Sequence, residues 1–112
     1  MSEVVFAMYK AKPGREKELE DLIARHVTIL RELDLVTARP RLTVKSSDGS
    51  YIEIIEWVDA SAAEKAHQHP SVASVWEAMA IVCDFRRLNE LPEANKPFSH
   101  LPVVDSLSDV FE

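Results

Sequence analysis

The sequence predicts an α+β domain in which a four-stranded antiparallel sheet carries two helices on one face. Segments rich in β-branched and aromatic residues alternate with segments of helical period, and turn signals separate them. Their order is strand, helix, strand, strand, helix, strand, which in a chain of 112 residues is a ferredoxin-like order. A chain of this length forms about one domain, so we expect a single domain at residues 1–104 and a C-terminal tail at residues 105–112.

The first two predicted elements are a strand at residues 4–10 and a helix at residues 15–35, with a Pro-Gly turn between them. Along the helix, apolar side chains recur every three or four residues, and His26 falls within this apolar stripe. Acidic side chains crowd its first half, where they suit the positive end of the helix dipole. Pro40 stops any continuation of the helix.

Two strands flank a turn signal at residues 46–50, and the alternation of side chains selects the length of the loop. A two-residue loop at Asp48 and Gly49 would mix polar and apolar residues on both faces of the hairpin. A three-residue loop at residues 47–49 gives one apolar face, and it places Gly49 at the left-handed position that such a loop requires. We therefore predict the register with the pairs Val44–Ile52, Leu42–Ile54, Thr43–Glu53 and Lys45–Tyr51.

In this register the second face of the hairpin is mixed, and we expect the helices to cover the other, apolar face. The mixed face has too many polar residues to form a core and too many aromatic residues to be exposed to solvent. We therefore expect a second copy of the chain to cover it in a symmetric homodimer, with Tyr51, Ile55 and Trp57 at the interface. The hairpin residues of this mixed face are Arg41, Thr43, Lys45, Tyr51, Glu53, Ile55 and Trp57.

The second helical segment opens at residues 61–64, whose Ser-x-x-Glu pattern is typical of a capping box. Pro70 interrupts this segment, and Ser71 caps it again. Apolar residues then continue with helical spacing to about Phe85, so we predict a kinked or two-part helix. The last predicted strand is short and lies at residues 98–104, where a proline confines it to an edge of the sheet.

Four stretches carry a resemblance to a known family. They are Val-Val-Phe-Ala-Met-Tyr-Lys-Ala-Lys-Pro-Gly-Arg-Glu at residues 4–16, the Glu- and Leu-rich first helix, the stretch from Tyr51 to His67, and Pro-Ser-Val-Ala-Ser-Val-Trp-Glu-Ala-Met at residues 70–79. Over residues 3–104 the chain resembles the antibiotic biosynthesis monooxygenase-like domain of the dimeric α/β-barrel superfamily. The resemblance implies a homodimeric barrel with a pocket between the helices and the sheet.

The same resemblance implies a cofactor-free, monooxygenase-like oxidoreductase that acts on a small aromatic or quinone-like substrate in this pocket. The alternative is a non-catalytic dimer of the same fold, which binds a small ligand or has a structural role. Haem-degrading members of the group use an Asn on the first strand and a Trp and a His on the second helix. Here the first strand has no Asn, and Trp76 stands near the position of that His. We therefore expect no haem and no other cofactor.

His26 is the candidate catalytic residue, because a neutral imidazole that faces the sheet can act as a base or bond to a ligand carbonyl. The alternative is a core histidine bonded to a backbone carbonyl. Trp76 and Met79 share one helix face and form either packed core or the wall of a cavity for a flat ligand. Tyr9, at a strand end, and His67, before the proline, complete the candidate substrate-binding residues.

The remaining composition limits the class of partner. His67 and His69 would diverge by about 200° on a helix and could not share a metal ion, so we expect no metal site. A net charge of −6 argues against nucleic acid or an anionic membrane as partner. No apolar run approaches the roughly 18 residues of a membrane helix. The single cysteine, Cys83, favours a reducing cytoplasm, and the expected partners are a second copy of the chain and a small-molecule ligand.

Overall fold

The structure of the chain is a computed structural model that describes residues 1–109. It is an α+β fold with a four-stranded antiparallel sheet and three helices, compatible with the ferredoxin-like class. The strands are β1 (Glu3–Ala11), β2 (Leu42–Lys45), β3 (Tyr51–Trp57) and β4 (Cys83–Phe85), in the sheet order β2-β3-β1-β4. The helices are α1 (Glu16–Glu32), α2 (Ala62–His67) and α3 (Pro70–Val82), followed by three short 3₁₀ helices, η1 (Leu88–Glu90), η2 (Pro92–Asn95) and η3 (Asp105–Leu107).

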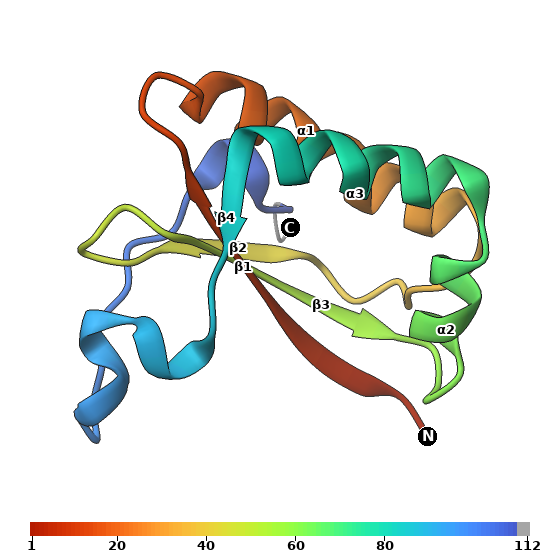
Figure 1. The fold of residues 1–112 in the computed structure, drawn as a ribbon. Helices are drawn as coiled ribbons and strands as arrows, with labels where there is room; N and C mark the ends of the chain where they lie inside the picture. Colours follow the sequence, from red (N-terminus) through yellow and green to blue (C-terminus); the bar gives the residue numbers. More distant parts are fainter. Residues whose placement is uncertain (110–112) are drawn as a thin grey trace.

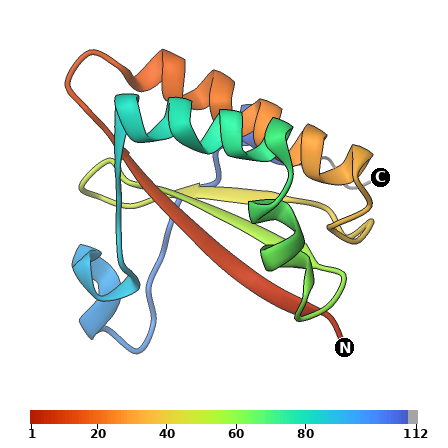
Figure 2. The ribbon, with the colours of Figure 1, turned by 45° about the vertical axis from the view of Figure 1, so that its right-hand side comes forward.

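The helices α1 and α3 lie side by side over one face of the sheet, and α2 lies at one end of this layer (Figures 1 and 2). The buried stripe of α1, which includes Leu19, Ile23 and Leu30, packs into the layer between helices and sheet. The segment after β4 crosses to the opposite side of the sheet, where Leu91 packs against Val44. The helices therefore cover one sheet face, and a single irregular segment covers part of the other.

The hairpin between β2 and β3 has the predicted register. Val44 pairs with Ile52 and Thr43 with Glu53, and the loop of three residues closes through a hydrogen bond from the Ser46 amide to the Ser50 carbonyl. Gly49 has a φ of 91°, in the left-handed region where a side chain would be strained. The alternation of side chains was therefore sufficient to select the loop.

The prediction of which sheet face the helices cover is wrong. Tyr51 packs against α1 and α3, and Ile55 and Trp57 pack against the other end of the same layer. The mixed face thus lies in the core of a single chain, so it cannot form the predicted dimer interface. The face away from the helices is the more apolar one; Lys10 and Glu56 lie on it, and its apolar residues are Val4, Phe6, Met8, Leu42, Val44, Ile52 and Ile54. We call these residues the apolar sheet face.

The fourth strand is also not where the sequence predicted it. The strand β4 begins at Cys83, immediately after α3, where the backbone turns extended, so the predicted continuation of the helix to Phe85 is three residues too long. The segment at residues 98–104 forms only an isolated bridge between Val103 and Val44. Prolines in and before this segment lack the amide hydrogen that a continuous ladder needs, which keeps it short.

The predicted two-part helix is confirmed, but its caps differ. The break falls between α2 and α3, and Pro70 occupies the first turn of α3 after an extended His69. Ser71 therefore lies inside the helix rather than at its cap. At α2 the Ser61 hydroxyl donates to Asp59 instead of capping the helix, so the predicted capping box does not form.

The predicted tail is tied to the sheet over its first half. Leu107 is buried, and its carbonyl accepts a hydrogen bond from the Thr43 hydroxyl at 2.6 Å. The Asp109 carboxylate accepts from the backbone amide of Arg41 at 2.6 Å and pairs with Arg31 on α1. Residues 110–112 of the predicted tail lie outside the described residues. Within residues 1–109, no helix combines the length and the apolar character needed to cross a membrane.

Candidate functional site

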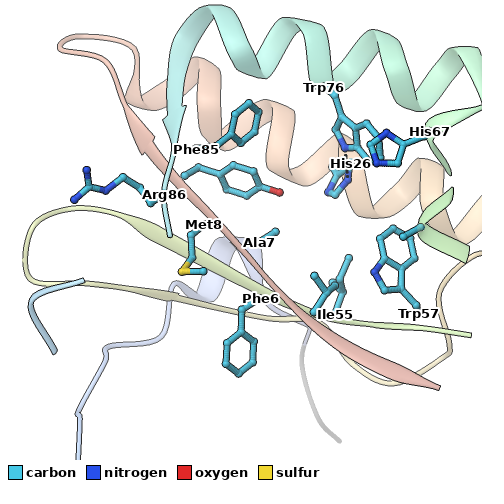
Figure 3. A pocket seen from close by; sticks show the side chains of 13 residues that line it. Phe6, Ala7, Met8, His26, Ile55, Trp57, His67, Trp76, Phe85 and Arg86 are labelled. Carbon is cyan, nitrogen blue, oxygen red and sulfur yellow. Dashed lines mark hydrogen bonds between the residues drawn. The ribbon is translucent and has the colours of Figure 1, made fainter. Parts of the chain in front are cut away.

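A cavity of about 530 Å³ opens along the edge of β1. The short β4 pairs only with Tyr9, Lys10 and Ala11, so the first part of β1 has no neighbouring strand on that side. The cavity lies between this free edge and the helices α2 and α3 (Figure 3). Its lining is mainly aromatic and aliphatic: Val5, Phe6, Ala7, Met8, Tyr9, His26, Ile55, Trp57, Ala63, His67, Trp76, Phe85 and Arg86. An apolar cavity with a few polar groups is the usual form of a small-molecule site.

Four side chains from four elements form one hydrogen-bonded chain at the inner wall of this cavity. The Tyr9 hydroxyl of β1 donates to Glu53 Oε1 of β3 at 2.9 Å. The same oxygen lies 3.0 Å from Nδ1 of His26 on α1. On the far side of the imidazole, the indole Nε1 of Trp76 on α3 donates to His26 Nε2 at 2.9 Å. Figure 3 shows His26 and Trp76 side by side beneath α3.

This chain fixes the protonation of the imidazole. An indole N–H can only donate, so His26 Nε2 must carry a lone pair. The proton of the neutral ring then lies on Nδ1, from where it is donated to Glu53 Oε1. His26 is therefore in the Nδ1–H tautomer, and the lone pair of its Nε2 accepts the hydrogen bond of Trp76. The predicted alternative, a histidine bonded to a backbone carbonyl, is not what the structure has.

The local sequence explains why a carboxylate can lie here. Glu53 is fully buried in the middle of β3, and its cross-strand neighbours on the helix face are Ala7 and Thr43. The short side chain of Ala7 leaves room for the longer carboxylate, and His26 reaches it from the buried stripe of α1. Two donors meet Oε1, whereas Oε2 is buried and has no hydrogen-bond partner among the described residues. The unpartnered, buried Oε2 is the costly part of this arrangement, which points to a role beyond packing.

The tyrosine of the chain stays protonated over the physiological range. Burial raises the pKa of Tyr9 well above its usual value, and the negative charge of Glu53 and the hydrogen bond to it raise it further. Tyr9 is therefore a permanent donor to Glu53. Its ring packs edge-on against Phe85, with ring centroids 5.9 Å apart. Cys83 is close by but buried, and burial raises the pKa of its thiol to about 11, so the thiol is not an activated nucleophile.

The structure brings four of the five sequence-predicted site residues to this cavity. Tyr9, His26 and Trp76 belong to the hydrogen-bonded chain, and the His67 ring packs edge-on against the Trp76 indole with centroids 4.5 Å apart. Met79 is fully buried in the core beside Tyr51 and does not line the cavity. It supports the cavity only indirectly, through packing behind the wall.

Glu53 is the residue that the sequence reasoning missed. It was placed on the mixed face of the hairpin but given no chemical role. The available signal was that Glu53, one of two carboxylates in β3, alternates onto the same face as Tyr51 and Ile55. Such a residue needs a buried partner once that face lies under the helices. Arg86 also lines the cavity, and its guanidinium pairs with Asp48 and Glu90.

No group of three or more His, Cys, Asp or Glu side chains that could hold a metal ion occurs within residues 1–109. Comparisons with family models, with curated proteins and with solved structures gave no match to the chain. The function therefore has to be argued from the cavity and its hydrogen-bonded chain.

Proposed function

We propose that the cavity binds a small, flat aromatic or quinone-like molecule and that the protein is a cofactor-free, monooxygenase-like enzyme. One observation carries the proposal: a neutral imidazole of defined tautomer, backed by a buried carboxylate, stands at the wall of an aromatic-lined cavity of about 530 Å³. Aromatic walls such as Trp57, Trp76 and Phe85 suit a planar ligand through stacking and edge contacts. A buried His–Glu pair next to such a cavity is a typical arrangement for a general base.

The chemistry assigned to the chain is the removal of a proton from a phenolic hydroxyl by His26. The resulting phenolate is electron-rich and reacts with O₂ without a metal or flavin. When a phenol becomes a para-quinone, one oxygen atom of O₂ ends in the new carbonyl. The other oxygen leaves as water with the hydroxyl proton and the hydrogen of the attacked carbon. His26 first receives the hydroxyl proton and later returns it, so the base is regenerated.

A second candidate function is binding without catalysis. The observation that favours it is the Trp76 indole, which occupies the lone pair of His26 that a base would use. A ligand that cannot displace this contact would bind in the cavity without losing a proton. Both functions share the cavity and the ligand class, and they differ in whether His26 reacts.

An oxygen-uptake screen of phenols and hydroquinones, with chelator-treated protein, separates the two functions. Turnover is expected for at least one compound, and His26→Gln is expected to lower its rate by about a hundredfold or more. His69→Gln is the matched control, because His69 bonds to Ser71 outside the cavity. Binding without oxygen uptake would leave only the non-catalytic function. Absence of binding by every aromatic compound would overturn both.

We also propose that a second copy of the chain covers the apolar sheet face, giving the homodimeric barrel that the sequence suggested. Three of its residues are strongly exposed in the single chain, with relative exposures of 56% for Val4, 48% for Phe6 and 37% for Leu42. A continuous apolar face of this kind is unusual on a monomer. Two-fold pairing of identical faces is the commonest way to bury it.

We further propose a reducing, cytoplasmic location, because the single cysteine of the chain, Cys83, is buried and forms no disulfide.

Sedimentation at micromolar concentration tests the dimer. A dimer is expected for the unmodified chain, and Ile54→Asp is expected to dissociate it by placing a charge in the middle of the apolar sheet face. Ile81→Asp is the control, because Ile81 lies on α3 with 63% exposure and belongs to the helical surface. A stable monomer of the unmodified chain would overturn the proposed dimer.

A further inference from the structure

The contact between Trp76 and His26 joins one hydrogen-bond donor and one acceptor at the cavity wall. A hydroxyl group is donor and acceptor at once, so it can insert between them, donating to His26 Nε2 and accepting from Trp76 Nε1. Two bonds of normal length require the two nitrogens to separate from 2.9 Å to about 4.5 Å. Trp76 is only half-buried, whereas His26 is 4% exposed and held by Glu53, so the indole is the group that can move.

Glu53 supplies the negative charge that stabilises the imidazolium formed when a proton is transferred to His26. An imidazolium at this depth would be an unpaired buried charge without a counter-ion. Glu53 Oε1 lies 3.0 Å from His26 Nδ1, so the charged imidazole and the Glu53 carboxylate would form a hydrogen-bonded ion pair. Tyr9 donates to the same oxygen and holds the carboxylate in place when the charge appears. Arg86, which also lines the cavity, is already engaged by Asp48 and Glu90.

We propose that Glu53 is a positioning residue through which the cavity binds acidic aromatic hydroxyl compounds as their anions. In this step the ligand O–H bond breaks, its electron pair stays on oxygen, and a new N–H bond forms at His26 Nε2. The phenolate oxygen then accepts the hydrogen bond of Trp76 Nε1. No oxidant is consumed in the step. The inference rests on the proposed function of the same cavity, and it assigns the ligand class of that cavity.

The test uses para-nitrophenol, whose anion is yellow and whose acid is colourless, at a pH below its own pKa in solution. Binding to the unmodified protein is expected to produce the absorbance of the anion, in proportion to occupied sites. Para-nitroanisole has the same ring but no acidic proton, so it reports occupation of the cavity alone. It is expected to compete with para-nitrophenol.

Glu53→Gln retains the size of the side chain and removes its charge. The anion absorbance of bound para-nitrophenol is expected to fall about tenfold or more, since a charge-assisted bond is lost, whereas para-nitroanisole binding is unchanged. Glu56→Gln is the matched control on the same strand, because the Glu56 carboxylate bonds to Thr37 and Arg39 and does not line the cavity. It is expected to behave as the unmodified chain does.

Para-nitroanisole binding also shows whether Glu53→Gln has folded. If it has not, Trp76→Phe decides the question, because it removes the indole donor and is expected to lower the anion fraction of the bound probe. Anion absorbance that survives in a folded Glu53→Gln, or in Trp76→Phe where Glu53→Gln does not fold, would overturn the inference. So would binding of para-nitrophenol as the acid by the unmodified chain, and in both cases the proposed cavity would stand. If neither probe binds, the proposed function fails together with the inference.

Discussion

The two faces of the sheet differ in a way that reverses the usual expectation. The face under the helices contains Glu53, Thr43 and Tyr51, all with exposures of 1% or less. The face away from the helices is mostly apolar, yet Val4 and Phe6 on it are about half exposed, at 56% and 48%. The more polar face is therefore the one that the helices cover, whereas the more apolar face is exposed along β1 and buried only where the segment after β4 covers Val44 and Ile52.

The difference shows that a polar side chain can be buried where hydrogen-bond partners are available, whatever the average polarity of its sheet face. On the helix face, Glu53 meets donors from Tyr9 and His26, and Thr43 donates to the Leu107 carbonyl. Buried polar groups with such partners cost little, whereas they would be costly without them. On the apolar sheet face, Val44 and Ile52 pack against Leu91 of the segment after β4, whereas Val4 and Phe6 remain exposed in the single chain.

The largest expected effect comes from placing the same carboxylate on each face in turn, at adjacent positions of β3. Ile55 is 5% exposed and packs with Val27 and Leu30, so Ile55→Asp is expected to lower the free energy of unfolding by about 4 kcal/mol or more. Ile54→Asp lies on the apolar sheet face and is expected to cost the isolated chain only about 1 kcal/mol. Urea unfolding of both variants at dilution, where each is monomeric, measures the difference. Equal losses would contradict the assignment of the faces.

The hairpin illustrates what the sequence could and could not predict. Local alternation and the position of Gly49 fixed the pairing of β2 with β3, because register depends only on neighbouring strands. The choice of face depended on where α1 and α3 would lie, which is a long-range property. Apolar content favoured Ile52 and Ile54 for the interior, but α1 brought His26 to Glu53, and the C-terminal segment brought the Leu107 carbonyl to Thr43.

The site was predictable to a similar extent. The apolar stripe of α1 correctly placed His26 toward the sheet, and helical spacing brought Trp76 to the same layer. The contact between them could not be inferred, since it requires the relative position of two helices. The place of β4 was missed because Cys83–Phe85 continues the apolar spacing of α3 without a turn signal. That short strand leaves the edge of β1 open, and so it creates the cavity.

A smaller effect is expected at alkaline pH, and it arises only from the helix face. Burial and Glu53 raise the pKa of Tyr9 above its ordinary 10.0, so the unfolded chain loses this proton before the folded chain does. Above about pH 10 the folded state therefore binds more protons, and stability falls with rising pH by about 1.4 kcal/mol per unit for this group. Below that pH the contribution is constant.

Urea unfolding over a series of alkaline pH values measures this slope, and Tyr9→Phe is expected to reduce it by the share of Tyr9. The slope should not vanish in the variant. Burial raises the pKa of Tyr51 and that of Cys83, the latter to about 11, so both contribute with the same sign. An unchanged slope in Tyr9→Phe would show that Tyr9 ionises equally well in the folded chain and that Glu53 does not hold its proton.

The smallest expected effect concerns the loop that decides which residues reach which face. Gly49 has a φ of 91°, and an added Cβ would meet no atom within 4 Å, so Gly49→Ala tests the backbone conformation alone. We expect the free energy of unfolding to fall by about 1 kcal/mol. Gly49→Asn should recover part of it, because Asn tolerates the left-handed region. Ser47→Ala, in the same loop, is the control and should change stability by less than about 0.5 kcal/mol.

Hydrogen exchange of the backbone amides in β2 and β3 should keep its pattern in all three variants. A one-residue slip in register would place Ile54 under the helices in place of Ile55. The hydrogen-exchange pattern of both strands would then change.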